Sequence, residues 1–224
     1  MTSLGRIAAI VPALGALVWM SAQAVNLAMA GSAVHDANRE MNAWTPGNPP
    51  ASQTIAHVRD DVAHARGRAP RDPSLRELLG VLDARVGTPE YLREARVQLI
   101  AALELRPSSA YSWADLAEVD YRIGDTKGFF EKELVNAARL GPYEPEVQRT
   151  VANLGLAVWD EIEPGTRAAV DAMVAAGMRR NPLAILQIAE RRGRLVIACR
   201  HLAGSPRQPD AKWSRMCQST EVTS

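Results

Sequence analysis

The sequence predicts an all-α protein, in which a stack of antiparallel helical hairpins follows an N-terminal transmembrane or signal helix. Aromatic residues make up only 5% of the 224 residues, and the common residue types Ala, Leu and Arg lose little side-chain freedom in a helix. Apolar residues recur at intervals of three and four, as they do on one face of a helix. Pairs of such segments return after about 35–40 residues, which is typical of stacked helical repeats.

Composition also limits the function. The formal net charge is +1, so no basic field would attract nucleic acid, and we predict no nucleic-acid partner. The sequence has no Gly-rich phosphate loop, no nucleophile elbow and no series of metal ligands, so we predict no cofactor, no metal site and no catalytic residue. Acidic residues are frequent, but no pair stands out as a general acid and base. We therefore predict a non-catalytic protein, whose oligomeric state is left open.

The N-terminal segment, residues 1–30, predicts the compartment. It carries no charge from Ile7 to Ala30, and about 20 apolar residues suffice to cross a bilayer. Arg6 supplies a short positive segment that favours a cytoplasmic N-terminus. The run Ala-Met-Ala at 28–30 has the form of a signal-peptidase site, so a cleaved signal peptide is the alternative to a signal anchor. We predict a single-pass inner-membrane protein with its C-terminal domain in the periplasm, or a periplasmic protein if cleavage follows Ala30.

Residues 31–71 are predicted to form a spacer with one or two short helices. The run Pro-Gly-Asn-Pro-Pro at 46–50 ends any helix that continues out of the membrane. Apolar residues at helical spacing then predict a short helix near 52–66.

This short helix carries the clustered histidines of the chain. His57, Asp61 and His64 share one helix face and could converge on a metal ion. They lie on a polar face beside two arginines, without the order of a zinc-binding motif and without a further ligand nearby. We interpret them as a solvated helix face.

Residues 72–182 are predicted to form a helical-repeat domain of about three hairpins. Helix starts are marked by capping residues and by Pro at the first helical position, and the turns contain Gly. The stretch 108–142 keeps this plan most clearly, with a turn at Gly124 and Asp125, and the third hairpin follows it less faithfully.

A further residue pattern recurs in these hairpins. It is a large residue, then Leu and a small residue, followed by Gly, Ala and Pro, and it occurs at Trp113, Leu116, Ala117, Gly124, Ala137 and Pro142. It returns at Leu79, Gly80, Gly87, Ala95, Ala102 and Pro107, and weakly at Leu154, Gly155 and Pro182. This pattern resembles the tetratricopeptide repeat, in which a small residue lets the two helices approach each other. Val170 departs from the pattern, because a small residue is usual there.

The tetratricopeptide resemblance implies a concave groove lined by the first helix of each hairpin. Carrying over the repeat register gives the inward polar and aromatic positions as Tyr111, Glu118, Arg122, Arg149 and Asn153. We predict that these residues bind a protein partner. Packing between helices is the alternative role for each of them.

Three runs of sequence, 105–121, 138–162 and 180–200, carry a narrower resemblance. They look like the VpsP-type proteins of bacterial surface-polysaccharide clusters, which are small and membrane-anchored or exported. This resemblance implies a scaffold or adaptor in exopolysaccharide biosynthesis or export, with envelope proteins of the assembly system as partners. Two alternatives are an adaptor of another envelope machine (secretion, pilus or cytochrome maturation) and, as the weaker one, a glycan-active enzyme.

Residues 183–224 are predicted to form a capping helix and a tail tied back by a disulfide. In an exported protein, two cysteines near one end of the chain are naturally read as a pair, here Cys199 and Cys217. The same region has a basic edge, which we interpret as a solvated helix face, with contact to lipid phosphates or an acidic glycan as the alternative. Its members are Arg179, Arg180, Arg191, Arg192 and Arg194.

Overall fold

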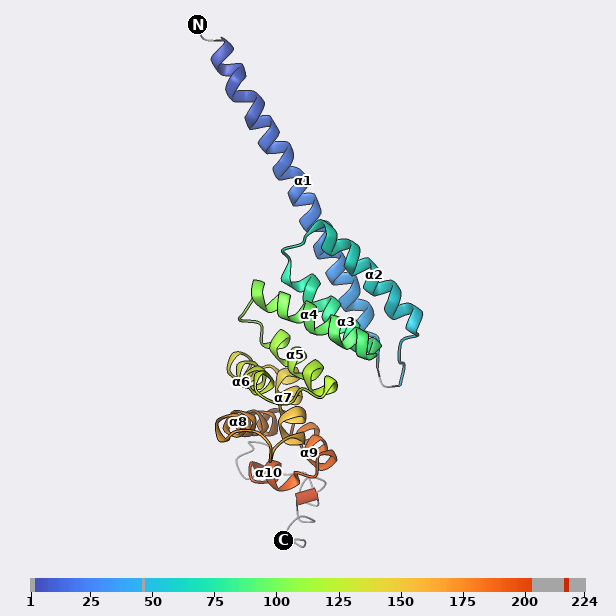
Figure 1. Cartoon of the computed structure of the whole chain (residues 1–224), viewed down its shortest axis with the longest axis vertical. Coiled ribbons are helices and arrows are strands. Elements are labelled where there is room, and N and C mark those ends of the chain that lie inside the picture. The colour runs from blue at the N-terminus through green and yellow to red at the C-terminus, as the bar shows by residue number, and fades with distance from the viewer. Residues whose placement is uncertain (1–2, 46, 203–215, 218–224) are drawn as a thin grey trace.

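The all-α prediction is confirmed by a computed structural model, which describes residues 3–45, 47–202 and 216–217 (Figure 1). Within these ranges the chain is helical apart from connections and an isolated bridge between Thr45 and Asn48. The helices named here are α1 (Ser3–Asn42), α2 (Ser52–Arg68), α3 (Pro73–Val86), α4 (Pro89–Leu105), α5 (Ala110–Ile123), α6 (Phe129–Leu140), α7 (Pro145–Ala157), α8 (Pro164–Arg180), α9 (Pro182–Arg191) and α10 (Leu195–Cys199).

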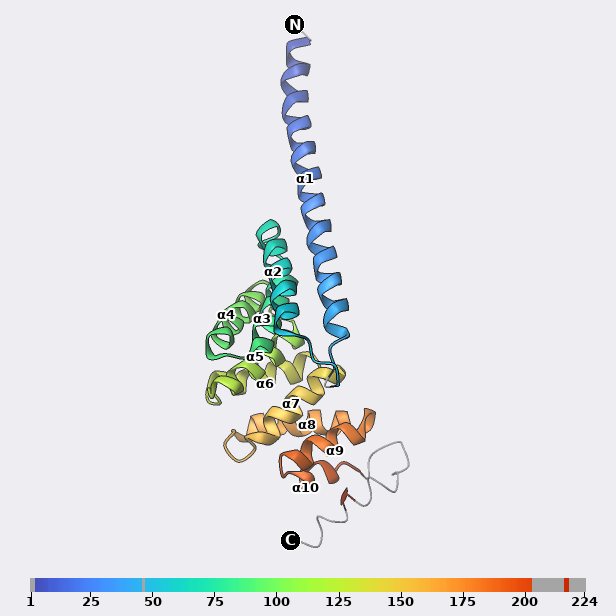
Figure 2. The ribbon, with the colours of Figure 1, turned by 90° about the vertical axis from the view of Figure 1, so that its right-hand side faces the viewer.

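The longest helix, α1, has two parts with different surroundings. Its 40 residues are about 60 Å long at 1.5 Å per residue, and its N-terminal part projects beyond the rest of the molecule (Figure 2). Large apolar side chains are exposed on this part, and Trp19, for example, is 64% exposed. The stretch Ala13–Asn42 is long and apolar enough to cross a membrane. The C-terminal quarter of α1 instead packs against α2 and α3.

This packing corrects the predicted spacer at 31–71. α1 continues without interruption to Asn42, and Ala30 and Ala37 are buried in one apolar cluster with α2 and α3. Small side chains at successive turns allow α2 to approach α1 closely, and α2 contributes three buried residues of its own to the cluster. Only the connection at 43–51 lies between two packed helices, so this region belongs to the folded domain.

The predicted hairpins correspond to three packed pairs of consecutive helices: α3 with α4, α5 with α6, and α7 with α8. The expected signals mark their ends. Asp72 caps α3 by accepting a hydrogen bond from the Ser74 amide at 2.8 Å. Gly87 and Gly124 end α3 and α5 with φ of 79° and 90°, a conformation that favours glycine. Membership of the tetratricopeptide family stays a prediction.

Glycine also allows close approach within two of these hairpins. A Cβ atom on Gly80 would lie 2.6 Å from Leu99 Cγ, and one on Gly155 would lie 2.3 Å from Val170 Cγ2. Both distances are far inside van der Waals contact, so only glycine fits without movement of its neighbour. The second contact explains the departure at Val170, because the small residue that the hairpin needs stands on the opposite helix, at Gly155.

Two buried aspartates form equivalent ion pairs between consecutive helices. Arg59 of α2 donates to Asp83 of α3 at 2.5 Å, and Arg96 of α4 donates to Asp120 of α5 at 2.7 Å, and in both pairs the partners are 24 positions apart in the sequence. Each aspartate side chain is only 1% exposed. The second pair follows the first after 37 residues, from 59 to 96 and from 83 to 120. The internal similarity therefore extends into the region that was predicted as a spacer.

The next equivalent position holds Glu133 in place of an arginine. Glu133 of α6 is fully buried, and burial together with the neighbouring Asp120 carboxylate raises its pKa to about 9. At neutral pH Glu133 is therefore protonated. Both of its oxygens and Asp120 Oδ2 are buried without a hydrogen-bond partner among the described residues. A protonated carboxyl, Glu133, is therefore buried beside the carboxylate of Asp120, which is paired with Arg96.

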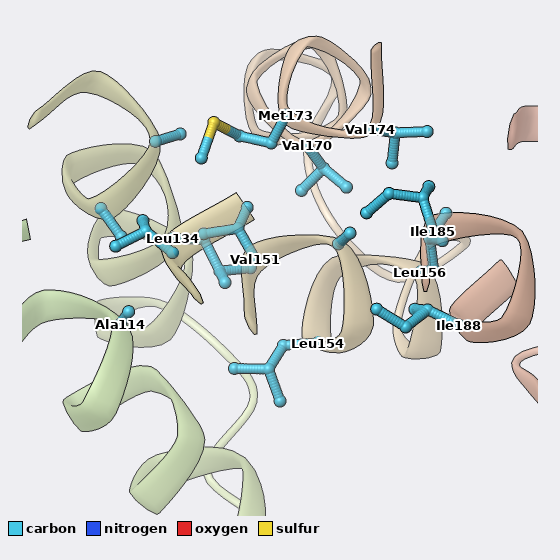
Figure 3. Close-up of a cluster of buried hydrophobic side chains, with 14 of the residues drawn as sticks. Ala114, Leu134, Val151, Leu154, Leu156, Val170, Met173, Val174, Ile185 and Ile188 are labelled. Carbon is cyan, nitrogen blue, oxygen red and sulfur yellow. The ribbon is translucent and has the colours of Figure 1, made fainter. Parts of the chain in front are cut away.

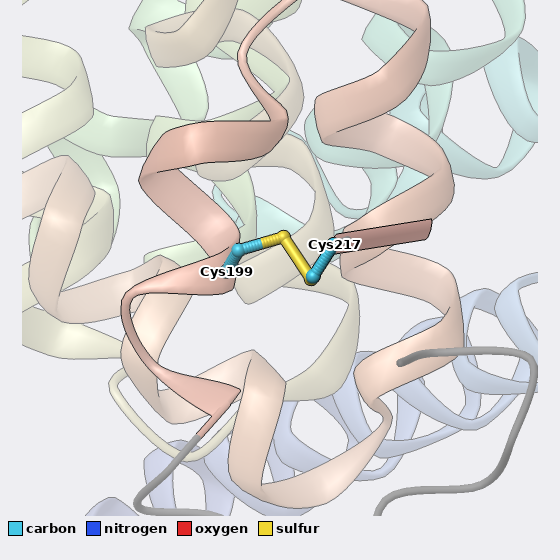
Figure 4. The surroundings of a disulfide bond; sticks show 2 residues. All are labelled: Cys199 and Cys217. Carbon is cyan, nitrogen blue, oxygen red and sulfur yellow. A yellow bond between two sulfur atoms is a disulfide. The ribbon is translucent and has the colours of Figure 1, made fainter. Parts of the chain in front are cut away.

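α9 and α10 cover the C-terminal end of the helical stack. The largest buried apolar cluster joins α5 to α10, and α9 contributes Ile185, Leu186 and Ile188 to it against α7 and α8 (Figure 3). Cys199 is bonded to Cys217, with Cα atoms 5.7 Å apart, so the predicted disulfide is present (Figure 4). Most of the tail that the disulfide encloses lies outside the described residues.

Candidate binding groove

A groove of about 600 Å³ lies where the end of α1 meets α3 and α5. Each of the three helices turns one face toward it, because its lining residues recur at intervals of three or four. Residues from the α4–α5 connection and from the ends flanking α6 and α7 complete the lining. The residues that decide its chemistry are Val34, Met41, Glu77, Val81, Tyr111 and Asp115.

Glu77 of α3 holds the start of α5 in place at one side of the groove. Its carboxylate forms an ion pair with Arg106, directly after α4, and accepts a hydrogen bond from Ser109 Oγ at 3.4 Å. Ser109 also caps α5, since its Oγ accepts from the Ser112 amide at 3.2 Å. The start of α5 is therefore held against α3, and this contact sets the width of the groove.

Tyr111, a predicted partner-binding residue, lines the groove. Its ring is 42% exposed, and its hydroxyl donates to Glu144 Oε2 at 2.6 Å. That hydrogen bond, helped by desolvation, raises the pKa of Tyr111 to about 12. Tyr111 therefore offers an aromatic surface whose hydroxyl stays protonated, as anchor residues of interfaces often do.

Asp115 lies one helical turn further along α5 and is half-buried in the groove. Desolvation raises its pKa to about 8, and the neighbouring carboxylates of Glu77 and Glu118 add to the shift, while Arg85 opposes it. At pH 7 this carboxyl is therefore mostly neutral. A cationic group placed beside it would favour its charged form, so binding of such a group would release a proton.

The groove combines acidic and apolar surface. Glu77, Asp115 and Glu144 line it, and Arg106, the arginine in its lining, is already paired with Glu77. Val34, Met41 and Val81 supply apolar side chains between the acids. An amphipathic polypeptide segment with Lys or Arg beside its apolar residues is the ligand class that matches this surface.

The other four predicted residues lie elsewhere. Glu118 is exposed on α5, and its negative charge helps to raise the pKa of Asp115 in the groove. Arg122 donates to the Ala84 carbonyl at 2.7 Å and so ties α5 to the end of α3. On α7, Arg149 pairs with Glu146 of the same helix, and Asn153 accepts from Arg192 Nε at 3.0 Å. The role of these four in partner binding stays a prediction.

The sequence reasoning missed the contribution of α1 and α3 to this groove. The signal was present in α1, where Val34, Ala37 and Met41 continue the helical spacing of the apolar segment beyond residue 30. The polar residue His35 and the charged residues Asp36, Arg39 and Glu40 lie between them and obscure this spacing. These charged side chains face solvent while the apolar face packs on α2 and α3.

The remaining candidate sites have local hydrogen-bond partners. His57 pairs with Asp61 at 3.5 Å, while the ring of His64 contacts the backbone oxygen of Asp60 at 2.7 Å. No group of three potential metal ligands occurs among the described residues. Within the basic edge, Arg192 and Arg194 bind residues of the same molecule, whereas Arg179 and Arg191 are exposed.

Comparison with protein-family models and with curated proteins finds no match to this chain.

Proposed function

We propose that the chain is a membrane-anchored, non-catalytic adaptor, which holds a segment of a partner protein in the groove formed by α1, α3 and α5. The observation that carries this proposal is the double role of α1. Its N-terminal part is long and apolar enough to cross a membrane, and its last turns form one wall of the groove. A partner bound there is held next to the membrane surface.

The anchor in this proposal remains attached to the folded domain. The candidate cleavage site at 28–30 lies inside a continuous helix, and Ala30 is completely buried. The intact helix keeps Ala30 packed in the apolar cluster with α2 and α3. Cleavage there would also release residues 31–42 from the helix that precedes them.

The cellular setting in this proposal is exopolysaccharide assembly, with the folded domain in the periplasm. The sequence resemblance at 105–121, 138–162 and 180–200 supports the setting. The disulfide between Cys199 and Cys217 supports an oxidising compartment. In this setting the partners are envelope proteins of the polysaccharide assembly system.

A matched pair of substitutions tests the adaptor function in a strain that lacks the gene. Val81→Arg adds bulk and positive charge inside the groove, while Val97→Arg makes the same change at a position on α4 that is 59% exposed. We expect deletion to reduce the amount or length of surface polysaccharide, Val97→Arg to restore it and Val81→Arg to fail at equal membrane abundance. Unchanged polysaccharide after deletion would contradict the role in exopolysaccharide assembly. Full restoration by Val81→Arg would contradict the claim that the groove binds the partner.

The non-catalytic part of the proposal has a separate test. The purified chain is incubated with surface polysaccharide from the same cells, and the chain length of the polymer is followed. We expect no change with time. Shortening of the polymer that is lost in the Asp115→Asn variant would show an enzyme, since Asp115 is the groove carboxyl that stays protonated near neutral pH.

A further inference from the structure

The end of α2 is the part of the folded domain that reaches furthest along α1 toward its N-terminal part (Figures 1 and 2). A second cavity, of about 350 Å³, lies here between α1 and the connection from α2 to α3. Gln23 and Leu27 line it from α1, and Arg68 and Arg71 line it from the connection. We call residues 66–73 the arginine tip.

The position of the arginine tip along α1 sets its height relative to a membrane. A hydrocarbon core of about 30 Å corresponds to about 20 residues of helix at 1.5 Å per residue. Counted from Ile7, where the uncharged run begins, such a span ends near Asn26. The cavity is lined by Gln23 and Leu27, at this same boundary. With α1 spanning the membrane as in the proposed function, the arginine tip lies where the lipid headgroups begin.

The charge of the two outer arginines is not neutralised within the molecule. Arg68 and Arg71 are exposed, and neither forms an ion pair with a described residue. Asp72, which caps α3 and also lines the cavity, keeps its negative charge, so the three arginines and one aspartate of the tip give a formal net charge of +2.

Two further arginines, Arg66 and Arg76, add positive charge near the tip, and both are hydrogen-bonded to neutral groups. Arg66 donates to the Gln98 side chain, and Arg76 donates to the Pro70 carbonyl, both at 3.4 Å. These contacts hold the side chains without cancelling their charge. Four arginines thus surround a connection that lies beside the apolar part of α1.

We propose that the arginine tip docks on the membrane surface, with Arg68 and Arg71 binding phosphate groups of anionic phospholipids in the leaflet from which α1 emerges. A guanidinium group matches a phosphate with two parallel hydrogen bonds, and its aliphatic stem can lie against apolar surface such as Leu27. Because the tip and α1 belong to one packed unit, this second attachment fixes the height and tilt of the folded domain.

The proposal is tested with the full chain in lipid nanodiscs, either of phosphatidylcholine alone or with added phosphatidylglycerol. The measurement is the rate of amide hydrogen exchange in the arginine tip. Each basic residue near an anionic surface contributes about fivefold in binding, so exchange should slow by about tenfold or more in the anionic discs, and high salt should reverse the effect.

Two double variants distinguish lipid binding by the arginine tip from a general effect of the positive charge of the molecule. Arg68→Gln/Arg71→Gln should exchange at the same rate in both discs, while Arg179→Gln/Arg191→Gln, which removes equal charge from the other end of the molecule, should keep the wild-type difference. Equal wild-type exchange in the two discs, or a difference that survives in Arg68→Gln/Arg71→Gln, would overturn the proposal. So would equal slowing by inorganic phosphate added to neutral discs. None of these readouts depends on partner binding in the groove.

Discussion

At the residue scale, the strictest requirement for a small side chain is at Gly155. The Cβ that any other residue would add collides with Val170 on the facing helix, and both residues are buried in the largest apolar cluster. Overpacking of this kind costs about 1–3 kcal/mol, because the facing helix has to move.

We therefore predict that Gly155→Ala lowers the free energy of unfolding by about 1–3 kcal/mol, measured by denaturant titration of the full chain in detergent. The control is Gly67→Ala in α2, where an added Cβ meets nothing within 4 Å. This change should be neutral or stabilising by about 0.5–1 kcal/mol, since Ala favours helix. A Gly155→Ala protein as stable as the control would contradict the tight α7–α8 contact.

Glu133 gives the fold a pH dependence that can be predicted with its sign. The buried carboxyl keeps its proton up to about pH 9, whereas the unfolded chain releases it near the ordinary value of 4.5. The folded state therefore binds the extra proton between these pH values, and stability falls as pH rises through this range.

Glu133→Gln removes this titration and can still donate to Asp120. We expect the melting temperature of the variant, relative to the wild type, to increase steadily between pH 4.5 and 9, by about 10 °C or more in total. The exposed Glu118→Gln serves as the control and should lack this trend. A constant or shrinking difference for Glu133→Gln would show that the buried carboxyl is ionised at neutral pH.

At the element scale, the sequence predicted the helices well where each had its own start and stop signals. Asp72 with Pro73, Ser109, and the glycines at 87 and 124 mark their helix ends as expected. The end of α1 was missed, because its last turns combine charged residues with small apolar ones and become intelligible only when α2 packs on them. Ion pairs between residues far apart in the sequence, such as Arg59 with Asp83, depend on the tertiary arrangement and could not be predicted either.

The C-terminal helix α10 depends on a covalent link. It has only five residues, of which Ile197 and Ala198 are buried, and its last residue is held by the disulfide. A helix this short is not stable by itself. We predict that Cys217→Ser lowers the stability of the chain by about 3 kcal/mol, as expected for the loss of a loop of this length.

The measurement is thermal unfolding with and without reductant. The wild type should lose stability on reduction, while Cys217→Ser should be insensitive to it. Equal melting temperatures for the reduced and oxidised wild type would mean that α10 is held by packing alone.

At the scale of the whole molecule, the groove forms where the end of α1 packs beside α3 and α5, although the sequence suggested that α1 and the helical hairpins were separate regions. The resemblance to helical repeats led to Tyr111, but it could not include the wall contributed by α1, which lies outside the predicted repeats. It also predicted partner binding by Arg122 and Asn153, which stays a prediction; their side chains contact the Ala84 carbonyl and Arg192, respectively. Side-chain partners of this kind depend on the packing of α5 on α3 and of α9 on α7.

The central claim, that a partner protein binds in the groove at the base of α1, is tested most directly by photo-crosslinking in the native cells. Benzoylphenylalanine replaces either Tyr111 in the groove or Tyr91, a similarly exposed tyrosine on α4 that does not line it; their exposures are 42% and 36%. We predict a discrete crosslinked product with one envelope protein from position 111, none from position 91, and loss of the product when Val81→Arg is added. Equal crosslinking from both positions, or none from position 111, would contradict the account.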